Sequence, residues 1–290
     1  MSNYPFIPSK FSNEILAHII GIFSSKSNEF PLILGIFGDP GEGKTYMCEQ
    51  LLLDFHIKRY DFSVSEFEDE SSGVPAKKLR TQYDKAVQNY AESQTHGVLM
   101  INDIDTAIGN WGDMHQYTVN TQHIVGELMQ ISDPHYNQSK RIPIIITGNN
   151  FSTIYMPLKR SGRIARFYWK PEEKDLIEIL SANYVGLSQK EISVLVCTLN
   201  SYAKTKLNGT LPVSFFTSLK SKLYKQSIVK LLDQQTSLRK MIASFNNQYQ
   251  DSKISVENLI SVGIEEINLI TATDEKHMGI EVKKGGHNTH

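Results

Sequence analysis

Apolar residues along the first 170 positions fall into short runs that predict strands. The runs lie at about residues 31–37, 59–64, 97–102, 142–147 and 165–169. Helical periodicity separates them at 76–91 and 119–131, and a short amphipathic helix at 13–23 precedes the first strand. Strands that alternate with helices are typical of a mostly parallel sheet with helices on its faces. We therefore predict an α/β nucleotide-binding subdomain over residues 1–170.

The pattern changes after Pro171, where no further strand-like run occurs. Helical periodicity continues at 172–182, 188–199, 215–233, 236–242 and 256–271. Residues 171–278 are therefore predicted to form a smaller, all-helical subdomain. The polar, glycine-containing tail at 279–290 is predicted to be a linker, so we expect the chain to be cut from a longer protein.

Composition excludes a few classes of protein. The formal net charge is −1, so nothing predicts bulk electrostatic attraction to nucleic acid or to a membrane surface. Cys48 and Cys197 are too few for a disulfide framework or a zinc site. No apolar run is long enough to span a bilayer. We expect partners other than nucleic acid and membrane.

The most informative motif follows the first strand. Residues 38–45 read Gly-Asp-Pro-Gly-Glu-Gly-Lys-Thr, which is the G-x-x-x-x-G-K-T pattern of a phosphate-binding loop between a strand and a helix. Glycines let backbone amides approach phosphate oxygens, and the helix N-terminus adds positive potential. Lys44 is predicted to reach the β- and γ-phosphates of ATP, and Thr45 to bind Mg²⁺. The residues predicted to bind nucleotide are Gly38, Gly41, Glu42, Gly43, Lys44, Thr45 and Tyr46.

Polar residues end two later strands of the predicted sheet. The strand at 97–102 runs into Asp103 and Asp105, and Asn149 follows the strand at 142–147. Asp103 is a candidate to orient the attacking water or to hold Mg²⁺ through water, and the alternative is a solvated acidic loop. Asn149 is a candidate to hydrogen-bond the γ-phosphate or that water, and the alternative is an ordinary turn asparagine.

Two arginines precede the final strand, Arg160 and Arg163. Guanidinium groups three residues apart can converge on one anion. They lie far along the chain from Lys44, so they are candidates to act on the nucleotide of a neighbouring subunit. The alternative is a pair of surface arginines.

Longer segments resemble the AAA+ ATPases and, within them, the Rubisco activase family. They are Pro31-Leu-Ile-Leu-Gly-Ile36, Gly73-Val-Pro-Ala-Lys77, Ile101-Asn-Asp-Ile-Asp105, Gln116-Tyr-Thr-Val-Asn120, Pro143-Ile-Ile-Ile-Thr-Gly-Asn149, Phe151-Ser-Thr-Ile-Tyr155, and Gly162-Arg163 with Phe167-Tyr-Trp169. The resemblance runs over about residues 5–170 and more loosely to about 278. It implies a ring-forming, usually hexameric ATPase that uses ATP and Mg²⁺ to remodel Rubisco blocked by bound sugar phosphates.

The resemblance also assigns roles to individual residues. It makes Thr45 and Asp103 the metal-facing residues, Asn149 the polar sensor, and Arg160 and Arg163 the arginine fingers that reach a neighbouring subunit. It places Lys77 in the first central-pore loop and Tyr117 in the second, where they would grip the substrate chain. Solvent exposure of Lys77 and packing of Tyr117 at a helix start are the alternatives.

The sequence departs from the resembling family in several places. Asn102 stands where most AAA+ proteins have aspartate. This leaves open which of Asp103 and Asp105 faces the metal and which faces the attacking water. Lys220 lies where the family's second sensor has arginine, and lysine lacks the planar guanidinium group that can bind an anion through two hydrogen bonds. Only about 30 residues precede the first core strand. We therefore expect a protein without the N-terminal extension of the plant proteins, which favours a cyanobacterial type located in the cytoplasm, with carboxysome association as one option, and the chloroplast stroma for a eukaryotic source.

Two other functions remain open on the sequence alone. One is a nucleotide-switched module of the clamp-loader or DNA-associated kind, which the near-neutral charge and the lack of a basic stripe disfavour. The other is a scaffold that binds ATP without hydrolysing it, which the set of acid, sensor and finger candidates disfavours.

Overall fold

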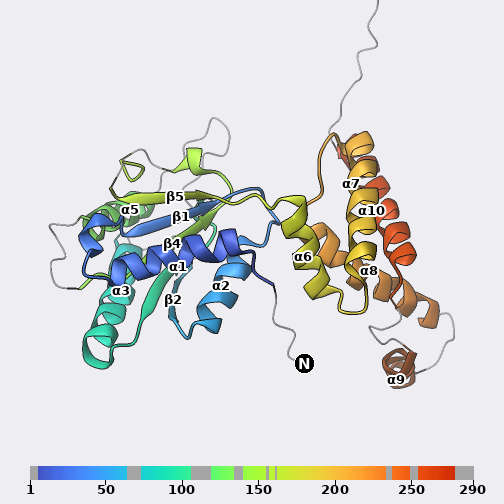
Figure 1. The fold of residues 1–290 in the computed structure, drawn as a ribbon, viewed down its shortest axis with the longest axis horizontal. Helices are drawn as coiled ribbons and strands as arrows, with labels where there is room; N and C mark the ends of the chain where they lie inside the picture. The colour runs from blue at the N-terminus through green and yellow to red at the C-terminus, as the bar shows by residue number, and fades with distance from the viewer. Residues whose placement is uncertain are drawn as a thin grey trace, which may run out of the picture. The chain divides into compact units, whose positions relative to one another are not determined.

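The chain folds into two compact units, residues 5–172 and 173–290 (Figure 1). The computed structural model describes residues 6–63, 73–105, 119–133, 140–154, 157–160, 162–232, 237–248 and 254–277. Each unit has a hydrophobic core of its own.

The first unit is built on a sheet of five parallel strands in the order β2-β3-β4-β1-β5 (Figure 1). The strands are β1 Ile33–Phe37, β2 Lys58–Phe62, β3 Gly97–Ile101, β4 Ile144–Gly148 and β5 Ile164–Tyr168. Strands β1, β3 and β4 are buried at every position, as expected for central parallel strands covered on both faces. Because β1, β3 and β4 are parallel neighbours, the segments that follow them meet at one edge of the sheet.

Helices and short 3-10 segments surround this sheet (Figure 1). They are α1 Ser9–Phe23, η1 Ser27–Glu29, α2 Lys44–Asp54, α3 Val74–Ser93, α5 Val119–Ile131 and η3 Phe151–Thr153. Apolar side chains of α3 and α5 pack with those of the strands in one continuous core.

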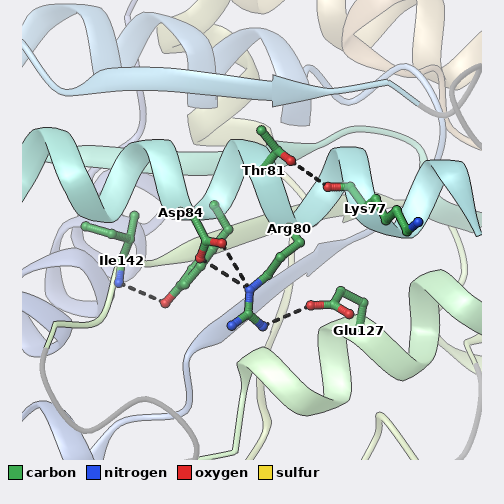
Figure 2. Close-up of polar contacts among 7 residues, drawn as sticks. Lys77, Arg80, Thr81, Asp84, Glu127 and Ile142 are labelled. Carbon is green, nitrogen blue, oxygen red and sulfur yellow. Dashed lines mark hydrogen bonds and ion pairs between the residues drawn. The ribbon is translucent and has the colours of Figure 1, made fainter.

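A polar contact fixes α3 to α5 (Figure 2). Arg80 of α3 donates from Nη1 to Glu127 Oε1 of α5 at 2.9 Å, and its Nε lies 3.3 Å from a carboxylate oxygen of Asp84. One helical turn further along α3, the hydroxyl of Tyr83 accepts the N–H of Ile142 at 3.2 Å. Helix α3 is therefore held both to α5 and to the segment that enters β4.

The second unit consists, in the part that the structure describes, of helices alone. They are α6 Glu173–Asn183, α7 Gln189–Leu207, α8 Val213–Leu232, α9 Leu238–Gln248 and α10 Val256–His277. Helix α7 begins with a capping box, in which Ser188 Oγ accepts the Glu191 N–H and Glu191 accepts the Ser188 N–H. The predicted fold class, a parallel α/β sheet followed by a helical region, is confirmed. None of the described helices combines the length and the apolar character needed to cross a bilayer.

His18 of α1 makes the stability of the first unit sensitive to pH. The side chain is buried, and its Nε2 lies 3.3 Å from the carbonyl oxygen of Leu32. Burial lowers the pKa of His18 from 6.5 to about 4, against the raising effect of the Leu32 hydrogen bond, and the charge of Arg141 adds to the lowering. Below pH 6.5 the unfolded chain therefore binds a proton that the folded chain does not, and stability falls until the pH reaches about 4.

We expect this group to remove about 2 kcal/mol from the free energy of unfolding between pH 7 and pH 5. Urea unfolding of the wild type and of His18→Gln at both pH values measures the difference. The variant should lose less stability on acidification by about that amount. Equal losses in the two proteins would show that the imidazole does not titrate in this way.

Candidate functional site

The loop between β1 and α2 has a backbone conformation that requires glycine. Gly41 and Gly43 have φ values of 80° and 76°, in the left-handed region. A Cβ at Gly38 would lie 2.0 Å from the carbonyl oxygen of Trp169, so a side chain has no room there. Helix α2 begins at Lys44, directly after the loop, and its first backbone amides are therefore available to an anion.

Lys44 lies at the centre of the candidate site. Its ammonium donates to the carbonyl oxygens of Gly38 and Asp39, at 2.7 and 2.9 Å, and to Asn149 Oδ1 at 3.1 Å. The residue is only 6% exposed. Burial lowers the pKa of Lys44 below its ordinary value, while the carboxylates of Asp103 and Asp105 are the largest influences in the opposite direction. The structure thus brings together a buried cation, the loop and the predicted sensor.

A second group of contacts connects α2 with the ends of β3 and β4. Thr45 Oγ1 lies 3.3 Å from Thr147 Oγ1, and Thr147 in turn donates to Asn102 Oδ1 at 3.2 Å. The backbone N–H of Asp103 donates to the same Thr147 oxygen at 3.1 Å. Asp103 has a φ of 50°, which is uncommon for a residue other than glycine. The two predicted metal-facing residues, Thr45 and Asp103, therefore both contact one threonine.

Asp105 holds the backbone beside the predicted sensor. Its Oδ2 accepts the N–H groups of Asn149 and Asn150, at 2.7 and 3.1 Å. Its Oδ1 is buried and has no hydrogen-bond partner among the described residues. The geometry gives Asp105 a role in orienting Asn149, whereas the roles of Asp103 toward metal and water stay predictions.

Trp169 supports the phosphate-binding loop from β5. Its indole N–H donates to the carbonyl oxygen of Glu42 at 3.0 Å, and its backbone N–H donates to Phe37 at 2.6 Å. The ring is fully buried and meets Phe11 edge-on, with centroids 5.0 Å apart. The Trp169 backbone thus lies against Gly38, where it leaves no room for a side chain, and its hydrogen bonds attach the loop to the end of β5.

The oxygen donors at this edge of the sheet fit Mg²⁺ with a triphosphate. A threonine hydroxyl and one or two carboxylates are the protein ligands that Mg²⁺ commonly takes, with phosphate and water completing its shell. The hydroxyl of Thr45 and the carboxylates of Asp103 and Asp105, which both act on the charge of Lys44, are donors of this kind, and Oδ1 of Asp105 has no hydrogen-bond partner among the described residues. The described residues contain no group of three or more His, Cys, Asp or Glu that would form an all-protein metal site.

The structure does not bring Arg163 to the lysine of the same chain. Arg163 directly precedes β5, and its carbonyl oxygen accepts the N–H of Ile33 at the start of β1, at 3.2 Å. The phosphate-binding loop follows the opposite end of β1. Because five strand residues span about 16 Å, the arginine and the loop lie at opposite ends of the strand. The Arg163 guanidinium donates to the carbonyl oxygen of Pro157 at 2.9 Å.

Arg160 is exposed and lies in a cationic surface region next to Arg163. The backbone N–H of Arg163 donates to its carbonyl oxygen at 3.2 Å. Arg160 lines a surface hollow together with Phe151, Lys159 and Arg166. The Arg166 guanidinium lies over the Phe151 ring, 4.4 Å from its centroid.

The sequence predicts four further site residues, of which the structure describes three. Lys77 is exposed in the first turn of α3, where its carbonyl oxygen accepts the Thr81 hydroxyl (Figure 2). Tyr46 is 54% exposed on α2. Lys220 belongs to α8 of the second unit, with its ammonium 6.0 Å from the centroid of the Tyr224 ring. Tyr117 lies outside the described residues.

Thr147 and Trp169 are site residues for which the sequence analysis assigned no role. Threonine is common in strands, so its position at the end of an isoleucine-rich run did not distinguish it. Trp169 was part of a segment that resembled a known family, but its contact with the loop joins residues 127 positions apart. An apolar strand followed by a residue that can hydrogen-bond is a weak signal, and it could have marked Thr147.

Comparison with known proteins agrees with this geometry. Residues 34–172 match the family described as ATPase family associated with various cellular activities (AAA). The chain is 36% identical over 232 residues to the ribulose bisphosphate carboxylase/oxygenase activase of Nostoc sp., which covers 76% of this chain and 54% of that protein. It is 30% identical over 276 residues to the chloroplastic activase of Zea mays, covering 89% and 61%. The chain spans between half and two thirds of the length of these relatives.

Proposed function

Because residues 34–172 belong to the AAA family of ATPases and the chain is related to the Rubisco activases, we propose that it hydrolyses ATP to remodel Rubisco. The form of Rubisco acted on is the one whose active site is blocked by a tightly bound sugar phosphate. The observation that carries this proposal is the convergence of Lys44, Thr45 and Asn149 at one edge of the sheet, in a chain with activases as relatives.

Each side chain of the site has a separate role toward the triphosphate, the attacking water or the metal. The Lys44 ammonium, buried and oriented by the carbonyl oxygens of Gly38 and Asp39, meets the β- and γ-phosphate oxygens. Asn149 directs its Oδ1 to Lys44, so the amide nitrogen of the same group is the donor that meets a γ-phosphate oxygen or the attacking water. Asp103 orients that water. Thr45 and Asp103 would hold Mg²⁺, which when bound would supply positive charge to the phosphates.

Positive charge for the transition state comes from a second copy of the chain. Arg163 lies about one strand length from its own loop, and we propose that Arg160 and Arg163 enter the site of the adjacent subunit in a ring of six. We also propose that Lys220 of the helical unit acts as the sensor of nucleotide charge. Movement of the helical unit about Lys170 and Pro171 then moves Lys77 and Tyr117, which grip a Rubisco segment in the central pore.

We also infer that the protein is located with Rubisco, in the cytoplasm of a cyanobacterial cell or in a chloroplast stroma. The relatives come from both sources, Nostoc and Anabaena among the former and maize among the latter. The activase relationship favours Rubisco over DNA as the target of the motor.

The function is tested by an activation assay on Rubisco locked with a sugar phosphate. With ATP and Mg²⁺ the protein should restore carboxylation, and without ATP, or with a non-hydrolysable analogue, it should not. Phosphate release should not respond to added DNA. Carboxylation that recovers equally without ATP, or phosphate release that only DNA stimulates, would contradict the proposal.

A further inference from the structure

Thr147 connects the phosphate-binding loop to the two strand ends that carry the acids. It is the penultimate residue of β4 and is fully buried. Its hydroxyl contacts Thr45 on α2, Asn102 after β3 and the backbone of Asp103. The Thr147 oxygen therefore joins three polar side chains, its own and those of Thr45 and Asn102, which come from three different parts of the fold.

The proton positions in this group follow from the chemistry of a hydroxyl. A hydroxyl has one proton to donate and two lone pairs to accept with. Thr147 uses its proton on the carbonyl oxygen of Asn102 and one lone pair on the N–H of Asp103. Its second lone pair can then only accept, so the 3.3 Å contact with Thr45 is a hydrogen bond donated by Thr45.

This direction determines what Thr45 can offer to a ligand. With its proton engaged by Thr147, Thr45 Oγ1 presents lone pairs and no hydrogen. A metal cation requires lone pairs, and a hydroxyl proton directed at it would be repelled. The same Thr147 oxygen anchors Asp103 at its left-handed φ of 50°, a conformation that costs a non-glycine residue free energy.

We propose that Thr147 is a positioning residue, which turns the Thr45 hydroxyl and the Asp103 backbone into the arrangement that a nucleotide-bound Mg²⁺ needs. This inference rests on the proposed ATPase function. Thr147 itself contacts neither nucleotide nor metal and acts only through its neighbours. Deletion of its hydroxyl removes one hydrogen bond from the Asp103 N–H and one from the Asn102 oxygen, and it frees the Thr45 proton to point at the metal.

The test compares Thr147→Val, which removes the hydroxyl at nearly constant shape, with Thr147→Ser, which keeps it. Thr121→Val is the matched control, because Thr121 is also buried but lies on α5. Loss of a residue that supports metal ligands typically costs about 10- to 100-fold in metal affinity or activity. Thr147→Val should lower kcat by about that factor and raise the Mg²⁺ concentration for half-maximal turnover. Thr147→Ser should stay within about threefold of the wild type.

A binding measurement separates this role from general damage and from failure of the ATPase proposal. Fluorescent ADP is titrated into each protein with EDTA and then with Mg²⁺. The wild type, Thr147→Ser and Thr121→Val should bind more tightly with Mg²⁺. Thr147→Val should keep the metal-free affinity and lose most of the gain from Mg²⁺, a result that holds even if no ATP is hydrolysed.

Two outcomes would overturn the inference. Retention by Thr147→Val of both the gain from Mg²⁺ and the turnover would show that the hydroxyl does not orient Thr45. If Thr147→Val and Thr147→Ser both lose affinity for ADP, and lose as much with EDTA as with Mg²⁺, then Thr147 has a purely structural role. Thermal unfolding checks that each variant is folded. Thr147→Cys, with only a weak S–H donor of similar size, replaces the valine variant if that one does not fold.

Discussion

Replacement of Lys44 by alanine is expected to abolish ATP turnover and ATP-dependent activation of Rubisco. The Lys44 ammonium is the shared donor to two loop carbonyl oxygens and to Asn149. Without it, those acceptors face the phosphates directly, and the nearby carboxylates of Asp103 and Asp105 repel the nucleotide without a compensating cation. Removal of even one hydrogen-bond donor to a developing charge costs about 10²- to 10³-fold in turnover. Loss of a charged donor, together with lower nucleotide affinity, should therefore leave turnover near background.

Steady-state phosphate release and fluorescent-nucleotide binding measure the effect of Lys44→Ala. Lys44→Arg separates the effect of charge from that of shape, because arginine keeps the positive charge but carries it on a larger, planar guanidinium. Lys204→Ala, at an exposed position in the last turn of α7, is the control for loss of a lysine elsewhere. A Lys44→Ala variant that reactivates inhibited Rubisco at the normal rate would show that ATP does not drive the process.

Much of the fold could be predicted because its signals are local. Apolar runs bounded by polar residues identified the strands, and parallel neighbours bring their ends together without further information. The extent of α7 was the clearest error in the elements. The sequence periodicity predicts a helix that ends at residue 199, whereas α7 continues to Leu207, with Ala203 fully buried and the left-handed Asn208 as its cap.

The site was predictable only as far as its motifs reach. Lys44 and Asn149 belong to recognisable segments, and their 3.1 Å contact follows from the sheet order. The contacts of Thr147 and Trp169 join residues more than 40 positions apart and depend on side-chain direction, which periodicity does not provide. The sequence does not distinguish the roles of Asp103 and Asp105, because the hydrogen bonds that Asp105 Oδ2 accepts from Asn149 and Asn150 arise only in the tertiary structure.

Replacement of Arg163 by alanine should also remove turnover, but for a different reason. The loop, Lys44 and Thr45 of the same chain are untouched, so an isolated protomer should keep its affinity for nucleotide. Loss of an arginine finger costs about 10³-fold or more in turnover, because charge on the transferring phosphoryl group loses its partner. Arg59→Ala is the control, because Arg59 is a partly exposed arginine that pairs with Glu49 on the surface. Turnover of Arg163→Ala near that of the wild type would rule out the shared site.

Mixing the two inactive variants tests whether the arginine acts between subunits. In a random assembly of Lys44→Ala and Arg163→Ala chains, about a quarter of the interfaces combine an intact lysine with an intact arginine, if the contacts are head-to-tail. Those interfaces should hydrolyse ATP, so the mixture should regain activity that neither variant has alone. If Arg163 acted on the nucleotide of its own chain, no mixture would restore a complete site. Because Arg163 lies one strand length from its own loop, recovery on mixing is the result that the proposed shared site predicts.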